Sequence, residues 1–298
     1  MTMIWKGVMP AMTTAFTEDL SIDHWFVAQH AQWMVDSGCT GIVTPGSLGE
    51  GNTMTFEERG EVWTTVVNAV GERAPVVGAI SALSTTEAVA QAKMAADKGC
   101  QGLMVLPPYV YKGDWREMKT HIAAVFRATG LSCMLYNNPV AYGTDFLPEH
   151  IQELAAEHDN FHSVKESSMD IRRVTALRAL LGERLAIFVG VDDAIVEGIA
   201  AGAVGWIAGL VNALPKESVD LFDYAMNGET EKAFELYRWF LPLLRLDTVP
   251  KFVQLIKLVQ QEVGMGNERV RLPRMELAGA EREAMLALIR DVLKRKGA

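Results

Sequence analysis

Short apolar segments alternate with amphipathic segments along most of the chain. The apolar segments are rich in β-branched residues and lack a polar face, a pattern typical of strands that are buried on both sides. Eight of them are predicted as strands, at residues 7–14, 40–45, 75–80, 102–106, 132–136, 161–165, 185–189 and 204–207. In the segments between them, apolar residues recur at helical spacing. These helices are predicted at residues 25–35, 56–70, 86–98, 115–129, 148–158, 172–181 and 194–201.

Strand and helix therefore follow each other through eight units, which predicts an α/β protein folded as a (β/α)8 TIM barrel. A repeated junction supports this prediction, because Gly38, Gly99 and Gly202 each follow a helix and precede a strand, where a left-handed glycine cap fits. After residue 210 the pattern is helical only. We expect residues 1–210 to form the catalytic barrel and residues 211–298 a C-terminal helical appendage. Its helices are predicted at residues 216–226, 229–246, 251–263 and 281–294.

Composition and charge narrow the possible partners. The chain has 298 residues and a formal net charge of -9, with no lysine and arginine stripe, so we expect it to bind no nucleic acid. No apolar run is long enough to cross a membrane, and residues 1–10 do not look like a secretory signal, which favours a cytoplasmic protein. Cys39, Cys100 and Cys133 lie in or beside apolar runs without metal-ligand spacing, and they are expected to be reduced and buried.

Two strand ends carry residues suited to covalent catalysis. The active site of a (β/α)8 barrel forms where the strands end and the loops begin. Lys165 ends one apolar strand and Tyr136 ends the strand before it, so both are expected at the same rim. Desolvation lowers the pKa of a lysine and leaves a nucleophilic amine, although a lysine at a strand end can also simply extend to solvent.

A second candidate is the loop Gly46-Ser47-Leu48-Gly49-Glu50 after the second strand. Its glycines allow backbone N–H groups to converge and its serine adds a hydroxyl donor, so the loop can hold a carboxylate, although such a segment can also be only a turn. It is not a phosphate loop, because no Gly-Lys-Ser/Thr follows. The six histidines form no metal-binding pattern and no serine-hydrolase motif occurs, so we expect neither a metal site nor a serine triad. Covalent catalysis by a lysine requires no metal and no organic cofactor, so we expect none.

Four motifs in order give a family resemblance: Gly-Ser-x-Gly-Glu, Pro-Pro-Tyr, Tyr-Asn-x-Pro and Lys-Glu-Ser-Ser. Together they resemble the dihydrodipicolinate synthase / N-acetylneuraminate lyase family, from residue 7 to about residue 212. The resemblance implies that Lys165 forms a Schiff base with a small 2-oxo acid or imine and that Tyr136 relays protons. It implies that Gly46, Ser47 and Leu48 hold the substrate carboxylate and that Tyr109 assists near a subunit boundary. Ile207 would line the floor of the site.

The departures from the family pattern bear on the substrate. Leu48 stands where the lysine-biosynthesis synthase has a second threonine of its proton relay. Ala141 stands where that synthase has an arginine for the second substrate's carboxylate, and a guanidinium cannot be replaced by alanine at such a site. The segment 136–143, which includes Tyr142 as a further substrate-binding residue, resembles the subgroup that breaks down hydroxyproline.

These observations favour a deaminase acting on 1-pyrroline-4-hydroxy-2-carboxylate. The alternatives are a 2-keto-3-deoxy sugar acid aldolase or dehydratase, and dihydrodipicolinate synthase itself. A non-catalytic oxo-acid sensor and a structural or assembly protein remain as alternatives of other classes. By the same resemblance we expect a homotetramer built as a dimer of dimers.

Overall fold

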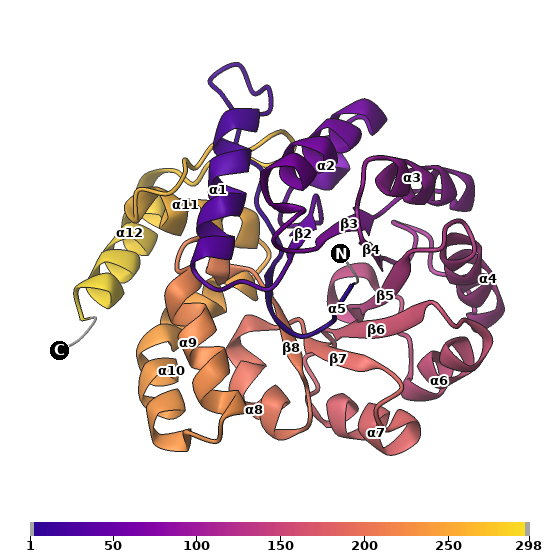
Figure 1. Cartoon of the computed structure of the whole chain (residues 1–298). Helices are drawn as coiled ribbons and strands as arrows, with labels where there is room; N and C mark the ends of the chain where they lie inside the picture. The colour runs from indigo at the N-terminus through magenta and orange to yellow at the C-terminus, as the bar shows by residue number, and fades with distance from the viewer. Residues whose placement is uncertain (1–2, 296–298) are drawn as a thin grey trace.

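The computed structural model describes residues 3–295, which form a ring of eight parallel strands surrounded by helices (Figure 1). The strands are β1 (Gly7–Pro10), β2 (Ile42–Thr44), β3 (Val76–Ile80), β4 (Gly102–Val105), β5 (Ser132–Asn137), β6 (Phe161–Glu166), β7 (Ala186–Val189) and β8 (Gly205–Ala208). From β2 to β8 each strand pairs with the next along the chain, and β8 pairs with β1. The ring closes where Ala11 bridges to Val43 and the Met12 N–H donates to the Val43 carbonyl at 2.9 Å. The predicted (β/α)8 barrel is confirmed.

The helices lie between the strands, as the sequence predicts. They are α1 (His24–Asp36), α2 (Phe56–Val70), α3 (Thr85–Asp97), α4 (Trp115–Phe126), α5 (Pro139–Tyr142), α6 (Pro148–Glu157), α7 (Arg172–Leu181) and α8 (Ile195–Ala200). Helix α2 has the predicted bounds, and it begins with a capping box between Thr55 and Glu58. The junction glycines Gly38, Gly99 and Gly202 have φ of +105°, +88° and +107°, which confirms the predicted left-handed conformation.

Two elements differ from the prediction. The first strand was expected to run to residue 14, but it ends at Pro10, and among the described residues 11–14 only the Ala11 and Met12 N–H groups donate to strand carbonyls, those of Ala208 and Val43, at 2.8 and 2.9 Å. Beyond it, the Thr13 N–H donates to the Asn212 side chain at 3.0 Å, so this stretch stays buried without being a strand. The short helix α5 was not expected. It forms because Pro139 suits a first helical position and the Asn138 side chain accepts from the Ala141 N–H.

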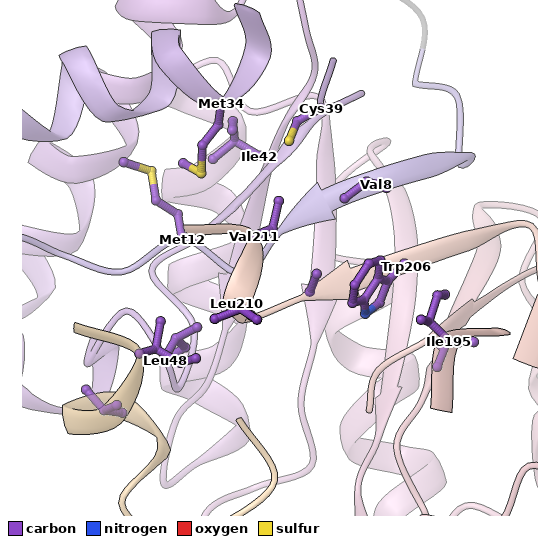
Figure 2. Close-up of a cluster of buried hydrophobic side chains, with 14 of the residues drawn as sticks. Val8, Met12, Met34, Cys39, Ile42, Leu48, Ile195, Trp206, Leu210 and Val211 are labelled. Atoms are coloured by element: carbon purple, nitrogen blue, oxygen red, sulfur yellow. The ribbon is translucent and has the colours of Figure 1, made fainter. Parts of the chain in front are cut away.

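Buried apolar side chains form two layers, because strand residues alternate between the two faces of the wall. The outer layer fills the space between strands and helices, and Figure 2 shows part of it, with Val8 of β1, Trp206 of β8 and Met34 of α1. The inner layer closes the middle of the barrel, with Met9, Val43, Val77, Ala79, Met104, Met134, Phe188 and Ile207 among its members. The ring is therefore a packed core, and only its rim is open for chemistry.

The chain after β8 is helical. It contains α9 (Pro215–Met226), α10 (Thr230–Leu244), α11 (Phe252–Glu262) and α12 (Gly279–Lys294). Helix α9 packs against β1 and α8, while α10, α11 and α12 pack together beside the barrel (Figure 1). The division into domains at residue 210 stays a prediction. No helix within residues 3–295 is long and apolar enough to span a membrane.

The three cysteines are unpaired and buried, as expected. Burial raises the pKa of each of these thiols to about 12, which leaves them protonated and chemically quiet.

Candidate active site

The register of β5 and β6 brings Tyr136 and Lys165 side by side. These residues are paired across the two strands, and both side chains point to the inside of the barrel above the inner layer. The Lys165 Nζ lies 4.1 Å from the centre of the Tyr136 ring, and only 6% of Lys165 is exposed. Space for the lysine comes from Gly190 after β7, because a methyl group there would lie 2.6 Å from the Lys165 Cε. The strand ends therefore hold a nearly buried amine against a phenol.

Asn137 and Glu166, the residues after Tyr136 and Lys165 on β5 and β6, point to the outer side of the barrel wall and hold the two strand ends in place. Asn137 and Glu166 are also paired across β5 and β6, and the Asn137 Nδ2 donates to Glu166 at 3.0 Å. Asn137 Nδ2 also contacts Asp145 at 3.3 Å, and Asp145 forms a two-pronged ion pair with Arg173 at 2.7 Å. Burial raises the pKa of the Glu166 carboxyl, while its hydrogen bonds oppose that rise. This network holds the backbone on either side of Tyr136 and Lys165.

The loop after β2 carries unused donors at the cavity. Among the described residues, the backbone N–H groups of Ser47 and Leu48 donate to no acceptor. Glu50 adopts the left-handed conformation with φ of +56°, and its buried carboxylate is bound by Lys257 at 2.6 Å. The Leu48 side chain packs into the outer core layer (Figure 2), so its backbone alone faces the site. The geometry suits a carboxylate ligand, as the sequence suggested.

Three tyrosines and one serine form a connected group across the cavity. The Ser47 hydroxyl hydrogen-bonds the Tyr142 hydroxyl, and the Tyr142 ring lies 5.7 Å from the rings of both Tyr136 and Tyr109. Asn138 donates to the Tyr136 hydroxyl at 3.0 Å. Burial, with the neighbouring phenols, raises the pKa of Tyr142 well above its usual value. Tyr142 therefore stays a neutral donor and acceptor that can pass a proton between its neighbours.

All eight residues predicted for the site line one cavity of about 1140 Å³ at the carboxyl ends of the strands. They are Gly46, Ser47, Leu48, Tyr109, Tyr136, Tyr142, Lys165 and Ile207. The structure thus brings together residues that are spread over 162 positions of the sequence, from 46 to 207. Whether each has its expected role stays a prediction, as does the position of Tyr109 near a subunit boundary.

Several cavity residues were not singled out from the sequence. The Ser167 hydroxyl is buried beside Lys165 and, within residues 3–295, has no hydrogen-bond partner. Arg59 of α2 is 4% exposed; its Nη2 donates to Ser81 at 3.2 Å, while its Nη1 has no partner in the same range. Asp247 reaches the cavity from the segment after α10. The Lys-Glu-Ser-Ser motif could have pointed to Ser167, but nothing local marks Arg59 or Asp247.

Asp192 belongs to the turn Gly190-Val191-Asp192-Asp193 after β7, and it was not singled out from the sequence as a site residue. It is fully buried and accepts hydrogen bonds from the Trp206 indole at 3.0 Å and from the Gly209 and Leu210 N–H groups at 3.1 and 2.8 Å. Burial raises its pKa to about 6, against these hydrogen bonds. Its position fixes the loop after β8. No cluster of three or more His, Cys, Asp or Glu within the described chain is arranged to hold a metal ion.

Comparisons with known proteins identify the family of this chain. The model of the dihydrodipicolinate synthetase family matches residues 4–292. A 4-hydroxy-tetrahydrodipicolinate synthase of Caldicellulosiruptor saccharolyticus is 30% identical over 288 residues, which cover 97% of each chain. The crystal structure of a putative dihydrodipicolinate synthetase from Pseudomonas aeruginosa has a TM-score of 0.91 at 31% identity, covering 96% of this chain and 99% of the other.

A second similar structure comes from a study of a monomeric dihydrodipicolinate synthase variant. It has a TM-score of 0.91 at 25% identity and covers 98% of this chain and 97% of the other. The expected homotetramer therefore stays a prediction, because similar folds need not share one oligomeric state. The match over nearly the whole chain shows that this protein belongs to the dihydrodipicolinate synthetase family and is a lysine Schiff-base lyase acting on small molecules.

Proposed function

We propose that this enzyme is a 1-pyrroline-4-hydroxy-2-carboxylate deaminase and that Lys165 is its Schiff-base lysine. The loop amides of Ser47 and Leu48 and the Ser47 hydroxyl would hold the C1 carboxylate. Tyr136 would transfer protons at the reacting carbon, with Tyr142 and Tyr109 completing the relay. Ile207 would form the floor beneath the bound substrate.

The observation that carries the substrate assignment is the face of the cavity formed by α5. Val140, Ala141 and Tyr142 line this face, and no cationic side chain projects from α5 itself. The Lys112 amine, from the loop before α4, lies beside Gly143 at the end of this helix. A synthase that condenses two acids must bind a second carboxylate, which needs charged donors at this face. A cyclic imine has one carboxylate, which the loop at Ser47 accounts for. A helix that presents a tyrosine hydroxyl and no cation of its own suits the hydroxyl and ring carbons of such a substrate.

The proposed chemistry starts at the ring imine. The Lys165 amine attacks C2, the bond from C2 to the ring nitrogen breaks, and its electron pair leaves with that nitrogen, which takes up a proton. A protonated Schiff base remains between Lys165 and C2. Tyr136 then takes a proton from C3, and the electron pair moves toward the Schiff-base nitrogen to give an enamine.

The enamine drives the departure of the C4 hydroxyl. Its electron pair returns to form a C3–C4 double bond, and the C4 oxygen leaves as water with one added proton. A proton shift converts the C5 amine to an imine, which water hydrolyses to an aldehyde and ammonia. A second water releases Lys165 from C2. In balance, the substrate takes up one water and yields ammonia and a 2-oxo acid with an aldehyde at C5.

The test combines trapping with product analysis. The protein is incubated separately with 1-pyrroline-4-hydroxy-2-carboxylate, a 2-keto-3-deoxy sugar acid, pyruvate, and pyruvate with aspartate semialdehyde. Borohydride is added, and peptide masses locate the adduct while ammonia and aldehyde are measured in parallel. We expect an adduct on Lys165 with the first substrate and also with pyruvate, but ammonia release from the first substrate alone. Lys165→Ala should lose the adduct and keep the fold, whereas Lys112→Ala, which alters another lysine of the cavity, should keep the adduct.

The other outcomes each exclude part of the proposal. Turnover of the sugar acid alone would establish an aldolase or dehydratase, and turnover with aspartate semialdehyde would establish a synthase. An adduct on a different lysine would refute the role of Lys165. Reversible binding with no adduct and no product would favour a sensor.

A further inference from the structure

Asp247 enters the active-site cavity from outside the barrel. It ends the short helix η4 (Arg245–Asp247), which follows α10. Its carboxylate lies against Gly209 after β8, because a methyl group at Gly209 would lie 2.1 Å from the Asp247 Oδ1. Only glycine leaves room for this side chain. Asp247 and Lys165 line the same cavity, and the charges of the two groups influence each other.

The Asp247 carboxylate is not used by the fold. Among the described residues, no group donates a hydrogen bond to it and no cation forms an ion pair with it. The two neighbouring acids differ, since Asp192 accepts three donors around the loop after β8 and Asp193 contacts the Arg245 Nε at 3.4 Å. A carboxyl group without partners is costly to bury, so an unused one that opens into a cavity points to a bound substrate.

The surroundings favour the protonated form of this group. Burial is the largest influence raising the pKa of Asp247, and the charge of Asp192 adds to it, while Lys165 opposes both. A carboxyl group whose protonated form is favoured in this way can donate a proton to a departing oxygen. Tyr136 contacts Lys165 from β5, whereas Asp247 approaches from the side of β7 and β8. A proton can thus be removed from C3 by Tyr136 on one side of the cavity and delivered to the C4 oxygen from the other side.

We propose that Asp247 is the acid that protonates the C4 hydroxyl as it leaves the substrate bound to Lys165. The C4–O bond breaks and its electron pair stays on oxygen. The Asp247 proton joins that oxygen, and water departs. The electrons of the enamine form the new C3–C4 double bond and restore the protonated Schiff base. Asp247 ends as a carboxylate and regains its proton from solvent before the next turnover.

This inference rests on the proposed function, so the experiment separates elimination from Schiff-base formation. Asp247→Asn keeps the shape of the side chain and cannot donate the proton. Two rates are measured by NMR in deuterium oxide. One is the exchange of pyruvate methyl protons, which needs Lys165 and Tyr136 but no leaving group. The other is ammonia release from 1-pyrroline-4-hydroxy-2-carboxylate. The matched control is Asp193→Asn, which removes a neighbouring acid paired with Arg245.

We expect Asp247→Asn to exchange pyruvate protons within about threefold of the wild type while ammonia release falls by roughly 10²–10⁴-fold, the usual contribution of a general acid. The variant should also exchange the C3 proton of the uncleaved substrate, because the enamine forms and returns. Asp193→Asn should match the wild type in both rates. If Asp247→Asn folds poorly, Asp247→Ala is expected to show the same separation of rates.

Unchanged ammonia release in either Asp247 variant would overturn the inference, and so would an equal loss of both rates, which would mean that Asp247 only maintains the site. If the wild type releases no ammonia, the proposed substrate is wrong. The same pair of rates is then measured with a 2-keto-3-deoxy sugar acid, which also carries a C4 hydroxyl. Failure of the substrate assignment and failure of the Asp247 assignment are therefore distinguishable.

Discussion

A buried ion pair connects the substrate-binding loop to the C-terminal helices. Lys257 of α11 is 2% exposed at its side chain and Glu50 is 0% exposed, with 2.6 Å between the Lys257 Nζ and the Glu50 Oε1. Lys257 also donates to the Arg269 carbonyl at 2.6 Å and lies 4.4 Å from the Phe16 ring centre. The second Glu50 oxygen accepts from the Arg271 N–H at 3.0 Å. All these partners of Lys257 and Glu50 belong to the protein and the pair is buried, so water cannot replace a hydrogen bond or charge that a substitution removes.

Lys257→Met removes the charge and keeps most of the apolar stem. It leaves the Glu50 carboxylate buried with one backbone donor and with Arg274 at 4.0 Å. Removing one partner of a buried pair costs about 3–5 kcal/mol, so we expect the free energy of unfolding to fall by that amount. Glu50→Gln should cost about 2–4 kcal/mol for the same reason. The double variant has no buried charge, and it should be about 2–3 kcal/mol more stable than the sum of the single changes predicts.

The assay is urea unfolding followed by circular dichroism, with the midpoint and slope fitted separately. At a slope of about 3 kcal/mol per molar urea, a loss of 4 kcal/mol lowers the midpoint by about 1 M. The control is Lys251→Met, which breaks an ion pair with Glu281 at 2.6 Å, where both side chains are about half exposed. This change should cost about 0–1 kcal/mol. The reasoning is refuted if Lys257→Met costs no more than Lys251→Met, or if the two buried changes are simply additive.

Three further predictions concern single residues. Tyr142→Phe removes the hydrogen bond to Ser47 and should lower kcat/KM by roughly 5–100-fold, the effect of about 1–3 kcal/mol for an unpaired buried partner, in steady-state kinetics. Gly190→Ala places a methyl group against Lys165 and should slow borohydride trapping at least tenfold, whereas unchanged trapping would contradict the close approach. Burial lowers the pKa of His30 to about 4, so the unfolded state takes up the proton first. Stability should therefore fall by about 1.4 kcal/mol per pH unit from pH 6.5 down to about 4, and His30→Gln should flatten this part of the urea-midpoint profile.

The fold was predictable because its periodicity is local. Apolar strands that are buried on both faces contrast clearly with helices that have one polar face, and a capping box marks the start of α2. The pattern could not predict where a residue far away in the sequence binds the backbone and interrupts a strand. Residues 11–14 have the composition of a strand, but Asn212 binds the Thr13 N–H instead of a neighbouring strand. Composition predicts burial there, and only tertiary structure decides which acceptor the backbone uses.

The candidate site was predictable where it follows from strand position. Lys165 and Tyr136 end neighbouring strands, and the register of a parallel sheet then pairs them without further information. Ser47 and Leu48 are part of a local loop that a motif can reveal. Asp247 is different, because it belongs to the helical tail and reaches the cavity only through the packing of η4 against the loop after β8. No spacing within the sequence relates it to Lys165.

This difference in origin explains how one fold can support several reactions. In the proposed mechanism the covalent step depends on Lys165 and Tyr136, whose arrangement is fixed by strand register and can change only if the barrel changes. In the same proposal the leaving group is contacted by residues on α5 and η4, such as Ala141 and Asp247, which can be substituted without altering a strand. Sequence identity of about 30% with named synthases therefore establishes the Schiff-base chemistry. It does not determine which group leaves the substrate, because that depends on these loops. An acid at 247 together with a neutral residue at 141 therefore supports the proposed elimination of a hydroxyl over the binding of a second carboxylate.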